Sequence, residues 1–359
     1  MQMADLYRFL GAATPLAIVK ESKHRTPPPC PYYTTCGGCQ LQHTTYSHQL
    51  EIKRLFVEDA FYRIGKIQHA VPPLTPSEKP FTYRRHITLQ IKQVKGIFQL
   101  CFSTNNYAPL PINSCLLLHE EKDLILSALQ EKFKKLPSSF SLEGRAKLLK
   151  VDRGYAAAFS FKTKLTSSQE KTLTEALSPL LEGLWIGTTP KKDLPLSFSC
   201  LGLTFFYSPF GFVQNHKEQS EKIYAFAEKL LSKSKKVLDL YCGLGISTLL
   251  LAKSGKDVIG IELSKESIAL AEKNSQHNQI FPREFICSAA EDIVDKQIAS
   301  FKPDALLVNP PKTGLDKKVR ESLTAPCIEQ VVYISCHPPT LARDVAFLKT
   351  KGFSIETLQ

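Results

Sequence analysis

Apolar positions along the last third of the chain predict a regular order of strands and helices. Short apolar runs, typical of buried strands, are separated by longer segments with helical spacing. The expected strands are KVLDLY, DVIGIE, EFICSA, DALLVN, VVYIS and FSIETL, and the expected helices are ISTLLLAKSG, SKESIALAEKNSQHN, DKKVRESLT and PTLARDVAFLKTKG. This order predicts an α/β fold with a doubly wound parallel sheet that binds ligands at the carboxyl ends of its strands.

The pattern upstream is different. Residues 44–65 have apolar positions at roughly helical spacing, and YRRHITLQIKQVKGIFQLCF alternates as a β-hairpin that turns near Lys95 and Gly96. Up to about residue 208, short strands mix with two charged helices, expected at residues 120–135 and 167–181. These features favour an α+β domain in the middle of the chain.

A chain of 359 residues is long enough for two or three domains. An amphipathic helix before residue 236 introduces the last of them. The predicted segments are an N-terminal cysteine segment (1–43), a helix packed on the catalytic domain (44–75), a central α+β domain (76–208) and the doubly wound domain (209–359).

Composition is that of a soluble protein, with 43% apolar and 22% charged residues. No run of apolar residues is long enough to span a bilayer, and the N-terminal stretch lacks the pattern of a secretory signal, which predicts a cytoplasmic protein. Lys and Arg outnumber Asp and Glu by 46 to 34, a formal charge of +12. This excess favours a nucleic-acid partner, although solvated lysines alone could account for it.

Two carboxylates and a glycine loop mark a candidate cofactor site. Asp239 lies in the first expected strand, Cys242-Gly243-Leu244-Gly245 follows it, and Glu262 ends the second strand. Glycines let a ligand approach the backbone beside a helix N-terminus, and a carboxylate at Glu262 can hold the hydroxyls of a ribose. A tight strand-to-helix turn with no ligand would give the same pattern.

Two observations favour S-adenosylmethionine over a dinucleotide. Asp239 stands where it would repel a pyrophosphate but not a cationic sulfonium ligand, and the third glycine of the dinucleotide fingerprint is missing. Asn309-Pro310-Pro311 then follows the fourth strand, where many methyltransferases carry a motif that faces the methyl group. A proline-stiffened loop is the structural alternative.

Cys336 follows the next strand, at the same edge of the expected sheet. The N-terminus of the following helix and Arg343 would favour its thiolate, whereas a cysteine without this context is more often simply buried. A methyltransferase needs a thiolate when the target atom is a poor nucleophile, as C5 of uracil is. Attack of sulfur at C6 makes C5 nucleophilic, and a base must later remove the C5 proton.

The motifs DLYCGLG, NPPKTGL and above all YISCHPPTLARD resemble the RNA uracil-C5 methyltransferase family, which makes 5-methyluridine in ribosomal and transfer RNA. The resemblance implies a class I, Rossmann-like methyltransferase domain. It assigns the nucleophile to Cys336, and it places Gln214, Tyr241, Gly243, Glu262 and Asn309 on positions that contact the cofactor.

Ten cysteines without an export signal are not expected to form disulfides. Cys30, Cys36 and Cys39 have the spacing C-x5-C-x2-C, which with Cys115 suits an iron-sulfur cluster. The residues alone suit zinc equally, with His43 or Cys115 as the fourth ligand. The resemblance favours a 4Fe-4S cluster, because the branch of the family that acts on 23S ribosomal RNA carries four such cysteines.

The same resemblance makes Arg84, Arg85, Lys312 and Arg343 candidates for contact with RNA, although a solvated hairpin face would also explain the first two. Several positions depart from the family. Ile246 and Asn309 stand where the family has asparagine and aspartate, and Lys312 replaces an arginine. The 29 residues before Cys30 leave no room for the family's N-terminal β-barrel, and no H-x-E motif with a general base occurs before Gln359. We therefore expect either that the methyltransferase domain lacks its C-terminal end in this sequence or that product release is impaired.

Two other functions remain open. An amino-methyltransferase could use Asn309-Pro310-Pro311 to orient an exocyclic amine, which would leave Cys336 without a task. A catalytically impaired RNA-binding protein would fit the positive charge and the missing base. The prediction is a monomeric enzyme acting on RNA, with ribosomal RNA favoured by the cysteines.

Overall fold

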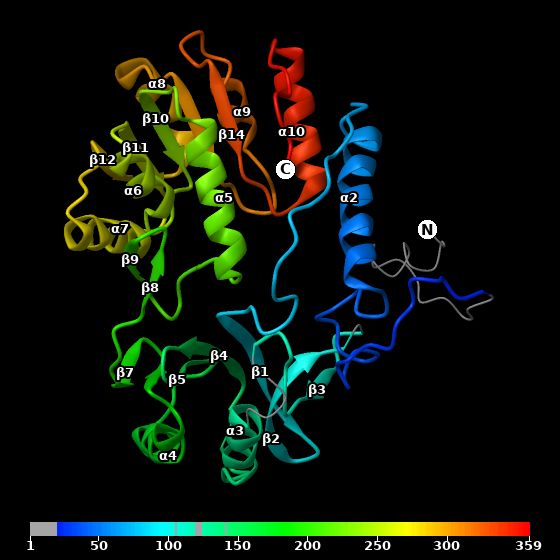
Figure 1. The fold of residues 1–359 in the computed structure, drawn as a ribbon. Coiled ribbons are helices and arrows are strands. Elements are labelled where there is room, and N and C mark those ends of the chain that lie inside the picture. The colour runs from blue at the N-terminus through cyan, green and yellow to red at the C-terminus, as the bar shows by residue number, and fades with distance from the viewer. Residues whose placement is uncertain (1–19, 105, 119–123, 141) are drawn as a thin grey trace. The chain divides into compact units, whose positions relative to one another are not determined.

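The computed structural model describes residues 20–104, 106–118, 124–140 and 142–359 (Figure 1). These residues form two compact units, and each unit is built from three separate stretches of chain. The first contains the described residues up to Ile52 together with Pro76–Leu196 and Asn215–Lys217. The second contains Lys53–Thr75, Ser197–Gln214 and Glu218–Gln359.

The first unit is built on a seven-stranded sheet with the order β3-β2-β1-β4-β5-β6-β7. All pairs are antiparallel except β5 with β6, which are joined through a helix. The strands are β1 (His86–Val94), β2 (Ile97–Ser103), β3 (Pro109–Pro111), β4 (Gly144–Val151), β5 (Gly154–Phe161), β6 (Gly183–Ile186) and β7 (Thr189–Lys192).

The hairpin predicted in this unit is confirmed. Val94 pairs with Ile97, and the two residues between them have positive φ angles, 51° at Lys95 and 80° at Gly96. Two such residues match the right-handed twist of the flanking strands, so a two-residue turn suffices.

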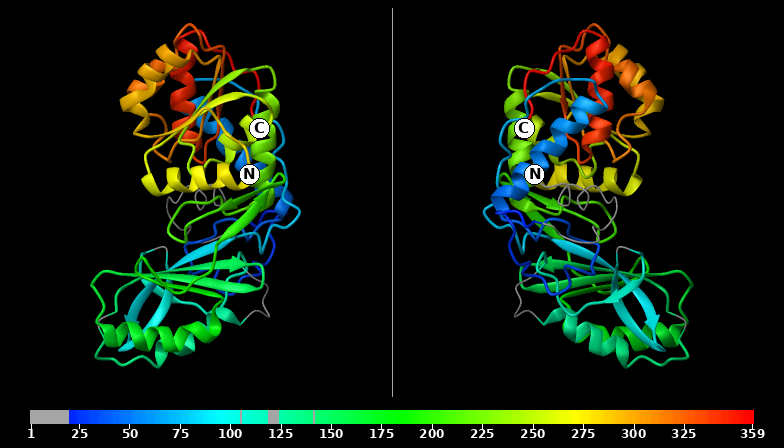
Figure 2. Two further views of the ribbon diagram at one scale, coloured as in Figure 1. Left: turned by 90° about the vertical axis from the view of Figure 1, so that its left-hand side faces the viewer. Right: turned by 90° about the vertical axis from the view of Figure 1, so that its right-hand side faces the viewer.

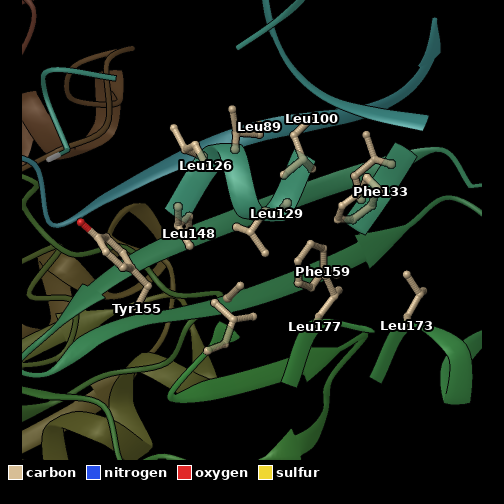
Figure 3. Close-up of a cluster of buried hydrophobic side chains, with 14 of the residues drawn as sticks. Leu89, Leu100, Leu126, Leu129, Phe133, Leu148, Tyr155, Phe159, Leu173 and Leu177 are labelled. Atoms are coloured by element: carbon tan, nitrogen blue, oxygen red, sulfur yellow. The ribbon is translucent and has the colours of Figure 1, made fainter. Parts of the chain in front are cut away.

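Helices α3 (Ile125–Lys134) and α4 (Ser167–Leu177) lie side by side on one face of this sheet (Figure 2). The predicted helices at residues 120–135 and 167–181 are thus confirmed with shorter bounds, although residues 120–123 lie outside the described part. A short 3-10 helix (Ser178–Leu180) follows α4. Leucine and phenylalanine side chains from the helices and the inner face of the sheet form the core (Figure 3).

The second unit contains a parallel sheet with the order β12-β11-β10-β13-β14, so the predicted doubly wound arrangement is confirmed. A two-stranded hairpin, β8 (Ser197–Cys200) with β9 (Leu203–Phe206), precedes it. The parallel strands are β10 (Lys236–Leu240), β11 (Asp257–Glu262), β12 (Glu284–Cys287), β13 (Ala305–Val308) and β14 (Gln330–Tyr333).

The helices of this unit are α5 (Lys217–Leu230), α6 (Ile246–Lys253), α7 (Lys265–Asn278), α8 (Ala290–Phe301), α9 (Lys317–Ser322) and α10 (Pro338–Thr350). Helix α8 was not predicted from the sequence, although Val294, Ile298 and Phe301 have helical spacing and are buried. Parallel strands of one sheet need a long crossover connection, and α8 is part of the connection that runs from β12, at the edge of the sheet, to β13 on the other side of β10.

The strand expected for FSIETL does not form, because residues 353–359 have no strand partner. Its apolar side chains instead pack beside helices. Ile355 and Leu358 join a cluster around Phe61 of α2 (Tyr46–Arg63) and Ala342 of α10. In the described ranges, every helix is too short or too polar to cross a membrane.

Candidate active site and cysteine cavity

Four neighbouring strands of the parallel sheet end at one edge, and each is followed by a predicted site residue. Tyr241 follows β10, Glu262 ends β11, Asn309 follows β13, and Cys336 lies three residues after β14. Because the strands are parallel, their carboxyl ends meet at the same edge. The fold therefore brings together the residues predicted to bind the cofactor and the predicted nucleophile.

The turn from β10 into α6 uses three residues with positive φ angles, 64° at Tyr241, 56° at Gly243 and 85° at Gly245. A Cβ at Gly243 would meet no atom within 4 Å, so this backbone faces open space. A Cβ at Gly245 would lie 3.0 Å from the Cβ of Ala271. The first glycine thus leaves the backbone accessible, and the second allows α6 to pack closely on α7.

Glu262 is tied to this turn through both carboxylate oxygens. Oε2 accepts a hydrogen bond from the backbone N–H of Gly243 at 3.2 Å, and Oε1 accepts one from Ser264 at 2.9 Å. Each carboxylate oxygen has two acceptor sites, so one remains free on each for a ligand hydroxyl.

Asp239 is fully buried, and its carboxylate is turned toward the first turn of α6. Oδ2 accepts hydrogen bonds from the hydroxyls of Ser247 and Thr248, both at 2.6 Å. Oδ1 has no hydrogen-bond partner among the described residues. Burial raises the pKa of Asp239 to about 6, with a smaller contribution from the nearby Glu262 and opposition from the two hydroxyls.

Two further positions that the resemblance singles out, Gln214 and Ile246, do not lie at these strand ends. Gln214 is half-buried and follows the buried Val213, before α5 begins. Ile246 is buried in an apolar cluster with Leu244 and Leu249. It therefore belongs to the packing of α6, in keeping with its departure from the polar residue of the family.

Cys336 is exposed in the turn between β14 and α10. His337 caps α10, and its Nδ1 accepts a hydrogen bond from the backbone N–H of Thr340 at 3.4 Å. The Thr340 hydroxyl donates to the carbonyl oxygen of Lys312 at 3.2 Å. The thiol turn is thus linked to the loop that carries Asn309 and Lys312.

The basic residues at this edge differ in their contacts. Lys312 is exposed. Arg343 donates to Oδ1 of Asp344 at 2.9 Å and to the carbonyl oxygens of Thr313 and Leu315 at 3.0 and 3.3 Å. The guanidinium of Arg343 therefore has a structural role in the loop.

In the first unit, the four predicted cysteine ligands Cys30, Cys36, Cys39 and Cys115 line one cavity of about 450 Å³. Burial raises the pKa of the Cys30, Cys36 and Cys115 thiols, and the negative charge that Cys39 can carry raises each of them further. Cys39 is therefore within electrostatic range of the other three thiols, although Cys115 is distant in sequence.

Arg84 also lines this cavity, and its positive charge lowers the pKa of Cys36 and Cys115, against the larger effect of burial. Its Nε is buried without a hydrogen-bond partner among the described residues. Arg85 is half-buried next to it, and its backbone N–H donates to the carbonyl oxygen of Asn215 at 3.0 Å. Unlike a solvated hairpin face, this arrangement directs Arg84 toward the thiols.

The residues around the cavity bear on the choice between zinc and an iron-sulfur cluster. Within the described ranges, no three His, Cys, Asp or Glu side chains converge closely enough to hold a metal ion. His43 does not line the cavity, and its Nδ1 lies 2.5 Å from the hydroxyl of Tyr33. The cavity lining therefore offers four thiols and one cation, without a converged ligand set for either zinc or a cluster among the described residues.

Comparison with known proteins gives a consistent picture. The family model described as tRNA (uracil-5-)-methyltransferase matches residues 202–357. An RNA methyltransferase of Protochlamydia amoebophila is 36% identical, over 97% of this chain and 82% of that protein. A second one, from Clostridium tetani, is 31% identical over 96% of this chain and 81% of its own.

Among solved structures, the chain resembles the Pyrococcus abyssi tRNA (uracil-54, C5)-methyltransferase, determined in complex with S-adenosyl-L-homocysteine. The TM-score is 0.69 at 23% identity, and the match covers 92% of this chain and 81% of that one. This likeness confirms the predicted fold class, with its Rossmann-like C-terminal domain.

Proposed function

Because this chain belongs to the RNA (uracil-5-)-methyltransferase family, we propose that it methylates C5 of a uridine through a covalent adduct with Cys336. The observation that carries the proposal is the exposed Cys336 thiol, in a turn linked to the loop after β13, at the sheet edge that also holds Glu262. An amino-methyltransferase would need no thiol at this position.

The chemistry follows from the thiol. The sulfur of Cys336 forms a bond to C6, and the electron pair of the C5–C6 double bond moves toward O4 to give an enolate. C5 then attacks the methyl carbon that S-adenosylmethionine would supply, and the S–CH3 bond of the sulfonium breaks to leave S-adenosylhomocysteine. A base removes the C5 proton, the double bond re-forms, and the thiolate leaves.

A uridine analogue tests this mechanism. With 5-fluorouridine in the RNA, the C5 substituent cannot leave as a cation, so the methylated adduct should stay attached to Cys336. Mass spectrometry should find it in the wild-type protein and in Cys287→Ser, a matched control at another exposed cysteine, but not in Cys336→Ala. Normal methylation by Cys336→Ala would contradict the mechanism and favour the amino-methyltransferase.

We further propose that Gln214, Tyr241, Gly243, Glu262 and Asn309 hold S-adenosylmethionine. Support comes from the open backbone at Gly243 and the free acceptor sites of Glu262 at the end of β11. Asn309 can donate or accept a hydrogen bond but carries no charge. Titration calorimetry with S-adenosylhomocysteine tests this site, and it also separates an enzyme from an RNA-binding protein that binds no cofactor.

For the first unit we propose a 4Fe-4S cluster held by Cys30, Cys36, Cys39 and Cys115. When bound, such a cluster supplies a rigid link between these distant segments, and Arg84 balances its negative charge. Protein purified without oxygen should contain about four irons per chain and absorb broadly in the visible range. Cys115→Ser should lose iron while Cys287→Ser keeps it, and stoichiometric zinc in the wild-type protein would overturn the proposal.

The substrate proposed for this enzyme is ribosomal RNA, bound by a monomer in the cytoplasm. The net charge of +12 supports a polyanionic partner, and Lys312 is exposed beside the candidate active site. Mapping 5-methyluridine in ribosomal and transfer RNA, from cells with and without the gene, tests the choice. Loss of the modification from transfer RNA alone would contradict the ribosomal assignment.

A further inference from the structure

A carboxylate with no access to solvent lies behind the candidate active site. Asp344 on α10 has 0% exposure, and its Oδ2 accepts hydrogen bonds from the backbone N–H of Leu315 at 2.9 Å and the hydroxyl of Tyr333 at 2.8 Å. Burying a carboxylate is costly unless its oxygens are well paired. Here the partners come from the loop after β13 and from the end of β14.

Two arginines balance the charge of Asp344. The Nε of Arg343 donates to Oδ1, and Nη1 of Arg320, on α9, lies 3.3 Å from the same oxygen. Gly314 lies against Arg343 and Asp344 with a φ of 76°, and a Cβ there would lie 2.7 Å from both Nη2 of Arg343 and Oδ2 of Asp344. The loop can therefore approach the carboxylate this closely only because residue 314 is glycine.

These contacts join the two segments that carry the candidate chemistry. Asp344 holds the loop after β13 at Leu315, and Arg343 holds it at Thr313. The same helix begins directly after Cys336, and its first turn holds the carbonyl oxygen of Lys312 through Thr340. A shift of α10 against this loop would change the distance between the thiol and the Asn309 segment.

We propose that Asp344 is a positioning residue, whose carboxylate fixes the Cys336 turn against the loop that carries Asn309 and Lys312. The proposal rests on the proposed covalent mechanism, because it assigns to Asp344 the alignment of the thiol with the target base. Asp344 is buried beneath both segments and acts through them.

Asp344→Asn tests the proposal, since the amide keeps the size of the side chain but removes its charge and puts a donor in place of one oxygen, facing either Leu315 and Tyr333 or the two arginines. We expect the rate of adduct formation with 5-fluorouridine RNA, at saturating RNA and cofactor, to fall by at least about tenfold, because small misplacements of reacting groups are costly. The Kd for S-adenosylhomocysteine should rise by a smaller factor than the rate falls, because Tyr241, Gly243 and Glu262 lie outside the two joined segments and only Asn309 lies in one of them.

Asp304→Asn is the matched control. Asp304 also accepts hydrogen bonds from backbone N–H groups, of Lys235 and Lys236 at 2.8 and 3.2 Å, but at the amino ends of β10 and β13. It should lower thermal stability and leave the saturating rate unchanged. An equal loss of rate in both variants, at a temperature where both are folded, would overturn the proposal.

Hydrogen–deuterium exchange tests the link between α10 and the loop after β13 without relying on activity. In Asp344→Asn, amides in residues 310–316 and 334–340 should exchange faster together, and in Asp304→Asn they should not. If the wild-type protein forms no adduct, the proposed mechanism fails, while the exchange result still decides the role of Asp344. If Asp344→Asn does not fold, Tyr333→Phe replaces it in the exchange measurement, because it removes one hydrogen bond to Asp344. Unchanged exchange in both segments would refute the proposal.

Discussion

Glu262 accepts a hydrogen bond from the backbone N–H of Gly243, which joins the end of β11 to the glycine turn after β10. The carboxylate of Glu262 thus stabilises the turn and, in the proposed function, also accepts hydrogen bonds from the ribose hydroxyls of the cofactor. Glu262→Gln should weaken binding of S-adenosylhomocysteine roughly 10- to 100-fold, because hydrogen bonds to a charged group are lost. Calorimetry should find Glu266→Gln, an exposed neighbour on α7, unchanged. Wild-type affinity in Glu262→Gln would exclude this role.

Gly245→Ala should destabilise the second unit more than Gly255→Ala. Both glycines have similar φ angles, 85° and 83°, so both substitutions impose a backbone strain of about 1–2 kcal/mol. Only at Gly245 would the new Cβ also press on other atoms, 3.0 Å from Ala271 and 3.1 Å from the ring of Phe285. Urea unfolding measures the difference in the free energy of unfolding. Equal losses in the two variants would mean that the contacts with Ala271 and Phe285 relax without cost.

The buried Asp239 makes stability depend on pH. Its pKa is raised to about 6 in the folded protein, so ionisation disfavours folding, and the penalty grows from about pH 4 to about pH 6. The penalty is absent below this window and complete above it, where it reaches about 3 kcal/mol. Asp239→Asn should therefore gain stability relative to the wild-type protein as pH rises through this window. A constant difference between the two unfolding free energies would contradict the assignment.

Arg84 should tune the proposed cluster. A cation near the thiols stabilises the reduced, more negative state, so Arg84→Gln should lower the reduction potential and make the cluster harder to reduce. Arg145→Gln, an exposed arginine on β4 of the same unit, serves as the control. Potentiometric titration of both variants measures the reduction potential. Equal potentials in the two variants would mean that the charge of Arg84 does not act on the cluster.

Local patterns predicted the features that depend on neighbouring residues. The two-residue turn at Lys95 and Gly96 and the glycine loop after β10 follow from the conformations that these residues permit. The parallel direction of the strands in the second unit follows from the alternation of strand and helix. The resemblance singled out Cys336, which lies at the predicted edge.

Long-range contacts could not be predicted in the same way. Asp344 stands in the motif around Cys336, but its partners Leu315 and Arg320 belong to another segment, and no local pattern pairs them. The cavity that Arg84 lines could not be predicted from its sequence position, because a basic strand start suggests RNA contact or a solvated face and gives no sign of the cysteines beside it. The segment FSIETL has the composition of a strand, but it forms none because no other strand pairs with it.

The interleaving of the two units along the chain has a consequence for synthesis. Residues 53–75 belong to the second unit, yet Phe61 packs against Ala342, which leaves the ribosome long after it. The first unit likewise waits for Asn215–Lys217 before its fold is complete. The first unit can therefore be completed only after residue 217 has been made, and the second only near the end of synthesis. A cut at any single peptide bond would divide at least one of them.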